Sequence, residues 1–262
     1  MAWKDVLIFA DGSENGLVRA GMAADLAVAL DADLEVCVPV CLPALSASGG
    51  VDFAVEVYDE LERDARDDAT RAAVEIPSRL PELAGRLAVG APETRPPDLA
   101  KLAGFLGQSC DLTIVGLAIR EDATRADDAL VEGALFRSGG PCLMFPQWNE
   151  PRSWGKRVLI AWKDVCEAAR AVHDAVPLLQ RAEAVGVATI QHGLRADRAG
   201  ERPLERLPRH LGRFGVRSES RIVPADGSDG VALLDQAERW SADLLVMGDT
   251  AIRSSGSAFR MA

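Results

Sequence analysis

Two short stretches contain the residues best suited to bind an anionic ligand. Asp11, Gly12 and Ser13 follow an apolar run that begins at Val6, and a helical pattern follows them. Glycine permits a sharp turn, and serine is a favoured helix cap. In an open α/β sheet such a helix start faces the carboxyl end of the preceding strand, where ligands bind. Asp11, Gly12 and Ser13 are therefore candidate nucleotide-binding residues.

The second stretch repeats the first later in the chain. Lys163 and Asp164 follow a similar apolar run, Val-Leu-Ile-Ala-Trp, that ends at residue 162. Segments 111–116 and 243–248 also match, in the pattern Asp-Leu-x-(Ile/Val)-(Val/Met)-Gly. Self-similarity on this scale indicates a tandem duplication. The candidate ligand residues in these segments are Lys163, Asp164, Gly116 and Gly248.

Each candidate also has a purely structural interpretation. Asp11 could contact a nucleoside, or it could cap its own Asp-Gly-Ser turn. Gly116 and Gly248 could let a phosphate approach the backbone, or they could simply end a strand. Lys163 could hold a phosphate as a point charge, or it could be an exposed lysine at a helix entry.

The sequence offers little for metal or hydrolytic chemistry. His173, His192 and His210 fall in different expected elements, and neither cysteine nor histidine clusters at metal-ligand spacing. No Gly-x-Ser-x-Gly motif occurs, and Ser13 has no histidine near it in sequence. We therefore expect no metal site and no catalytic residues, and we predict that the protein is not an enzyme.

Composition limits the classes of partner. The 262 residues are 48% hydrophobic and carry a formal net charge of −11, which repels nucleic acids and anionic membranes. There are five cysteines and no Cys-x-x-Cys pair, and Cys37, Cys110 and Cys142 are expected to be buried reduced thiols. Without a signal-peptide pattern or a run of ~18 apolar residues, a cytoplasmic protein is expected.

Hydrophobic patterning predicts a first α/β unit over residues 1–147. Strands alternate with helices, so the sheet should be parallel and covered on both faces. Strands are expected at 3–10, 34–40, 87–89, 111–116 and 142–145, and helices at 13–30, 53–79, 96–106 and 129–137. A polar linker at 148–155 follows, in which Pro151 disfavours regular structure.

The second unit, residues 156–262, repeats the order. Strands are expected at 156–162, 184–190, 216–223 and 243–248, and helices at 167–179, 204–214 and 226–240. Residues 249–262 leave no room for both a final helix and a final strand, so this unit is expected to be truncated. The last strand of the first unit would then lack its usual partner, and an unpaired edge favours a homodimer.

At this point the sequence resembles the tandem two-domain form of the universal stress protein family. The resemblance rests on Val-Leu-Ile-Phe-Ala-Asp11-Gly-Ser, Val-Leu-Ile-Ala-Trp-Lys163-Asp-Val and Ala242-Asp-Leu-Leu-Val-Met-Gly248, in that order. It implies two Rossmann-like units of the adenine nucleotide alpha hydrolase type, packed as an intramolecular pseudo-dimer. It also implies an acidic residue near the nucleoside in the members that bind ATP. Their phosphate loop is G-x-x-G, followed nine residues later by G-(S/T).

Both units depart from that loop pattern. Ile119 and Ala251 stand where the second glycine is expected, and Lys163 replaces the acidic residue. Gly133, followed by alanine, is the candidate for the final glycine of the first unit, although its spacing is longer. Acidic residues in and after the first loop would repel a polyphosphate; they are Glu121, Asp122, Asp127 and Asp128.

The resemblance therefore predicts a stress-response or regulatory protein with degenerate nucleotide binding and no cofactor. One alternative is an ATP- or AMP-binding protein with a variant loop at Asp11 and Gly116, with or without slow ATPase activity. Another is a different α/β ligand binder or enzyme, such as a relative of electron-transfer flavoproteins or adenine nucleotide hydrolases.

Overall fold

The computed structural model describes residues 2–43, 55–117, 125–147, 152–192 and 201–248. The chain divides into two compact units, Met1–Arg152 and Ser153–Ala262. No helix in the described part is long and apolar enough to cross a membrane. The expected loss of the last helix and strand of the second unit falls on residues 249–262, outside the described ranges.

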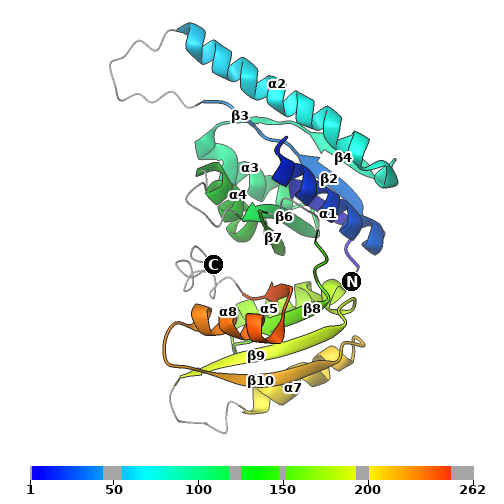
Figure 1. Cartoon of the computed structure of the whole chain (residues 1–262), viewed down its shortest axis with the longest axis vertical. Coiled ribbons are helices and arrows are strands. Elements are labelled where there is room, and N and C mark those ends of the chain that lie inside the picture. Colours follow the sequence, from blue (N-terminus) through cyan, green and yellow to red (C-terminus); the bar gives the residue numbers. More distant parts are fainter. Residues whose placement is uncertain (1, 44–54, 118–124, 148–151, 193–200, 249–262) are drawn as a thin grey trace. The chain divides into compact units, whose positions relative to one another are not determined.

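The first unit alternates strands and helices, as the hydrophobic pattern predicts (Figure 1). Its elements are β1 (Asp5–Phe9), α1 (Glu14–Leu30), β2 (Asp33–Cys37), α2 (Val55–Arg79), β4 (Leu87–Gly90), α3 (Leu99–Gly107), β6 (Leu112–Leu117), α4 (Arg125–Phe136) and β7 (Cys142–Pro146). The short strands β3 (Val40–Cys41) and β5 (Glu93–Thr94) pair separately, and 3-10 turns cover Pro81–Leu83 and Pro96–Asp98.

The main sheet of the first unit has the order β4-β2-β1-β6-β7, and every pairing in it is parallel. Leu7 and Phe9 of β1 pack against Ala103 of α3 and Ala134 of α4 in one buried cluster. Helices α1 and α2 lie on the other face (Figure 1). The central strand β1 is therefore buried on both faces, which explains its continuous apolar run.

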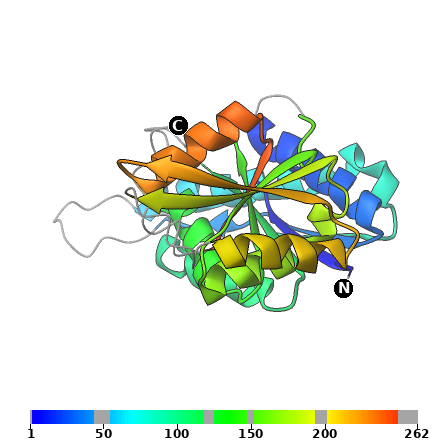
Figure 2. The same ribbon diagram turned by 90° about the horizontal axis from the view of Figure 1, so that it is seen from below.

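The second unit repeats this plan with four described strands in the order β10-β9-β8-β11, again all parallel. Helices α7 and α8 lie on opposite faces of its sheet (Figure 2). The elements are β8 (Arg157–Ala161), α5 (Cys166–Asp174), α6 (Val176–Leu179), β9 (Ala184–His192), α7 (Glu201–Gly212), β10 (Ser218–Ala225), α8 (Asp229–Trp240) and β11 (Leu244–Val246). Two tandem α/β units are thus present, as expected.

Several helix boundaries differ from the sequence-based expectation, and three of the differences have a local explanation. The single helix predicted at 167–179 is divided into α5 and α6 at Ala175, because Pro177 lacks an N–H and restricts the residue before it. Helix α4 begins at Arg125 rather than 129, with acidic residues in its first turn that favour the helix dipole. Helix α7 begins at Glu201 rather than 204, with Pro203 in its first turn.

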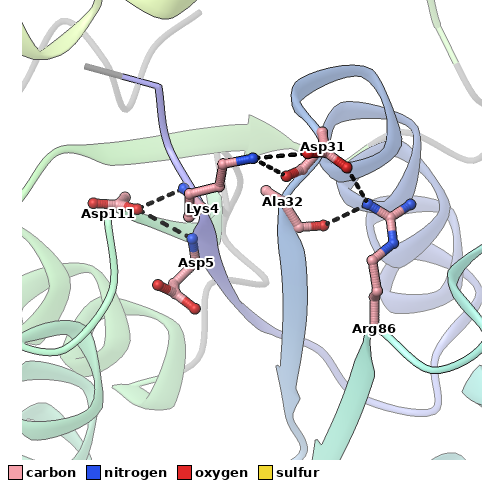
Figure 3. Close-up of polar contacts among 6 residues, drawn as sticks. All are labelled: Lys4, Asp5, Asp31, Ala32, Arg86 and Asp111. Carbon is pink, nitrogen blue, oxygen red and sulfur yellow. Dashed lines mark hydrogen bonds and ion pairs between the residues drawn. The ribbon is translucent and has the colours of Figure 1, made fainter.

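An aspartate anchors the start of the central strand in the first unit (Figure 3). The Asp111 carboxylate accepts hydrogen bonds from the backbone N–H groups of Lys4, at 2.6 Å, and Asp5, at 3.1 Å. The Asp111 N–H in turn donates to the Asp5 carbonyl at 2.9 Å. This two-way contact aligns β1 with β6, so that Val6 lies opposite Leu112.

The second unit contains the same anchor. The Asp243 carboxylate accepts hydrogen bonds from the N–H groups of Lys156, at 3.1 Å, and Arg157, at 2.9 Å. The Asp243 N–H donates to the Arg157 carbonyl at 3.0 Å. The Arg157 guanidinium donates to the Trp240 carbonyl at 2.8 and 3.1 Å and lies 4.6 Å from the centre of that indole ring. The aspartate of the repeated motif thus has the same role twice.

A second polar contact lies beside the first anchor (Figure 3). Asp31 ends α1 in the left-handed conformation, with φ of 53°. The Lys4 Nζ donates to its carbonyl at 2.7 Å and its carboxylate at 2.8 Å, and Arg86 approaches that carboxylate at 3.3 Å. The hydrogen bond from Lys4 and the nearby charges of Lys4 and Arg86 lower the pKa of Asp31. Any stability from this exposed contact is present above the ordinary carboxyl pKa and is lost as pH falls through the lowered value.

We predict that Asp111→Ala lowers the free energy of unfolding by about 1–3 kcal/mol, because two backbone N–H groups lose a charged acceptor. Urea denaturation followed by circular dichroism measures the change. Asp33→Ala, which removes an exposed carboxylate at the start of β2, is the matched control and should have little effect. Equal effects of the two substitutions would contradict the assigned role of Asp111.

Candidate functional site

The Asp11-Gly12-Ser13 turn joins β1 to α1 at the carboxyl edge of the first sheet. The Asp11 carboxylate accepts hydrogen bonds from the Ser13 N–H, at 3.2 Å, and from the Ser13 hydroxyl, at 2.5 Å. The Ser13 hydroxyl oxygen accepts from the Gly16 N–H at 3.0 Å, so Ser13 is the cap of α1. A Cβ on Gly16 would lie 2.1 Å from the Asp11 carboxylate, and only glycine leaves room for this turn. Asp11 and Ser13 therefore hydrogen-bond to each other, and Ser13 also accepts a hydrogen bond from the first turn of α1.

Gly116 faces an arginine on α1. A Cβ at Gly116 would lie 2.4 Å from a terminal nitrogen of Arg19, so the guanidinium lies directly against this glycine. The Nε of Arg19 donates to the Phe9 carbonyl, at the end of β1, at 3.3 Å. Gly116, which lies inside β6 and does not end it, thus makes space for a cation supplied by the protein itself.

The charges around Arg19 oppose one another. Burial lowers the pKa of the Arg19 guanidinium, while the negative charges of Asp11 and Asp127 act to raise it. Asp127 lies in the first turn of α4. Together the three side chains carry one net negative charge, so this part of the edge offers no net attraction to a phosphate.

Gly133 lies inside α4, at its contact with α3. A Cβ at Gly133 would lie 2.3 Å from the Ala100 carbonyl oxygen and 2.7 Å from the Ala103 Cβ. The following residue, Ala134, is fully buried. This placement assigns Gly133 to helix packing rather than to a phosphate loop. Gly12 similarly packs on α2, because a Cβ there would lie 3.3 Å from the Ala72 Cβ.

The corresponding edge of the second unit is built differently. Lys163 and Asp164 are exposed in the turn between β8 and α5, where the Val165 N–H donates to the Lys163 carbonyl at 2.8 Å. Gly248, after β11, lies against the backbone of the first turn of α5: a Cβ there would be 2.7 Å from the Glu167 carbonyl carbon. Close helix packing therefore accounts for this glycine as well.

Several residues of the predicted phosphate loops lie outside the described ranges. They are Ile119, Glu121 and Asp122 of the first unit and Ala251 of the second. Sequence reasoning missed Arg19, the most distinctive residue of the edge. The sequence did carry a signal for it. Arg19 is the single cationic residue of α1, and it lies three residues after Gly16 and four before Ala23. This spacing places it on the same helix face as those two buried residues.

Two solved structures that align with most of this chain are described as universal stress proteins, one of them as a candidate. A universal stress protein from Archaeoglobus fulgidus DSM 4304 aligns with a TM-score of 0.67 and 18% identity, over 98% of this chain and 93% of its own. A candidate universal stress protein from Pseudomonas aeruginosa UCBPP-PA14 aligns with a TM-score of 0.51 and 15% identity, over 95% of this chain and 88% of its own. No family model matches the sequence, and no curated protein matches it.

The chain has the universal stress protein fold. Within this fold, the described residues bring Asp11, Ser13, Gly116 and Arg19 to the carboxyl edge of the first unit. The edge of the second unit has Lys163, Asp164 and Gly248 instead, and Gly133 belongs to neither edge.

We predict that Gly133→Ala lowers the free energy of unfolding by about 1–3 kcal/mol, because the added methyl group overlaps the Ala100 carbonyl. Gly21→Ala is the matched control, because it also replaces a helical glycine but meets no atom within 4 Å. This control should gain about 0.5–1 kcal/mol from helix propensity. If Gly133→Ala is as stable as Gly21→Ala in urea denaturation, the packing role is wrong.

Proposed function

We propose that this chain is a member of the universal stress protein family that acts as a stress-response or regulatory module with weak or absent nucleotide binding. The fold supports the family assignment. The contact of Arg19 with Gly116 supports the degenerate site, because a side chain of the protein itself lies against the glycine that a phosphate would approach. The hydrogen bonds that the Asp11 carboxylate accepts from Ser13 further reduce its availability to a nucleoside.

We predict that calorimetry with ATP and with AMP detects no micromolar binding to the full-length protein. Purified protein should likewise release no nucleotide when it is denatured. Micromolar affinity for ATP, or co-purified nucleotide in stoichiometric amount, would overturn the proposal.

The second candidate function is ATP or AMP binding through a variant loop, with or without slow ATPase activity. The same guanidinium favours it, because arginine binds phosphate strongly and Arg19 lies against Gly116 near the carboxyl end of β6. Under this alternative, Arg19→Ala would weaken ATP binding at least tenfold, and phosphate release would accompany binding if the protein hydrolyses ATP. Arg71→Ala is the matched control, since Arg71 is an exposed arginine of α2 whose partner is Asp68 at 3.0 Å.

We also predict that the protein forms a homodimer or a larger assembly. Strand β7 is at the edge of the first sheet, and β6 is its one partner strand among the described residues. An open sheet edge can pair with a second copy of the chain. Light scattering at several concentrations measures the mass, and a monomer at all of them would contradict this prediction.

A further inference from the structure

Two of the three histidines, 37 positions apart in sequence, meet on the surface of the second unit. His173 is near the end of α5, and His210 is in the last turn of α7. Their Nε2 atoms are 3.2 Å apart and their ring centres 5.1 Å apart. Sequence spacing gave no indication of this pair, because the residues lie on separate helices.

The core below the pair holds both histidines in place. Val172, adjacent to His173, is buried in the same cluster as Leu207 and Leu211, which flank His210 on α7. The His210 ring also makes an edge-on contact with Phe214, with ring centres 5.2 Å apart. Packing between the two helices therefore brings the two histidines to adjacent positions.

We propose that His173 and His210 form a binding site for a divalent transition-metal ion of the Zn²⁺, Ni²⁺ or Cu²⁺ type. Zn–N bonds of about 2.0–2.1 Å at a tetrahedral angle place two ligand nitrogens about 3.3–3.4 Å apart. The observed 3.2 Å matches that separation, and imidazole nitrogen is a preferred ligand of these ions. Without metal, the same contact is a hydrogen bond in which one ring donates to the other.

The site is open. Within the described residues, no group of three or more histidine, cysteine, aspartate or glutamate side chains has the geometry of a metal site. Asp174, next to His173, is paired with Arg170 at 3.7 Å. His173 is exposed and His210 partly exposed, so water completes the coordination. An ion bound there links α5 to α7 and should stabilise the second unit against unfolding.

Two measurements on the metal-free full-length protein test the proposal: calorimetry and thermal unfolding. Each is made with Zn²⁺ and repeated with Ni²⁺. We expect one equivalent to bind and the unfolding midpoint to rise with metal concentration. His173→Gln and His210→Gln should each weaken binding at least tenfold and abolish the rise in midpoint. If His210→Gln fails to fold, the exposed His173→Gln still provides the test.

Two control variants distinguish metal binding at this site from binding at other side chains of the protein. His192→Gln replaces the third histidine, which contacts Asp229. Cys166→Ser removes an exposed thiol, and thiols in general can bind zinc. Both should bind Zn²⁺ like the unaltered protein. Absence of binding at millimolar Zn²⁺, unchanged affinity in His173→Gln, or loss of binding in Cys166→Ser would each overturn the proposal.

Discussion

The structure depends on one repeated contact, in which an aspartate carboxylate accepts the backbone N–H groups that begin a central strand. Asp111 serves β1 and Asp243 serves β8. Both strands lie in the interior of their sheets, where a shift by one residue would turn every buried side chain to the wrong face. By fixing the register at the amino edge, the contact also fixes which residues emerge together at the carboxyl edge. The position of Gly116 beside Arg19 is a consequence of that alignment.

The carboxyl edges show why glycine spacing is an ambiguous signal. Gly116 and Gly248 occupy equivalent places in the repeat, and both are required for close approach. What approaches them differs, since one faces a guanidinium and the other the backbone of α5. Ligand binding and helix packing can both require a residue without a Cβ, which is glycine. The presence of glycine in the sequence therefore does not show which of the two roles it has.

Much of the fold could be predicted from local pattern. The buried run of β1 and the Ser13 cap were recognisable, because continuous apolar strands and capped helices have strong local signatures. The division between α5 and α6 was missed because apolar periodicity continues through Pro177. Arg19 was missed because its partners come from β1 and β6, and the His173–His210 pair because it joins separate helices. Such contacts arise only when the sheet has formed.

The contact between Arg157 and Trp240 distinguishes the central strand of the second unit from that of the first. The two central strands share the core Val-Leu-Ile, so during synthesis either could insert between the neighbours meant for the other, and such domain swapping is a known failure of repeated units. The residue before that core differs, Asp5 in one strand and Arg157 in the other. If β1 took the place of β8, the Asp5 carboxylate would lie near the Trp240 carbonyl. The hydrogen bonds and the ring contact that the Arg157 guanidinium makes with Trp240 would then be lost. The first side chain of each strand therefore distinguishes two strands that share the same apolar core, since Arg157 makes contacts with Trp240 that an aspartate could not make.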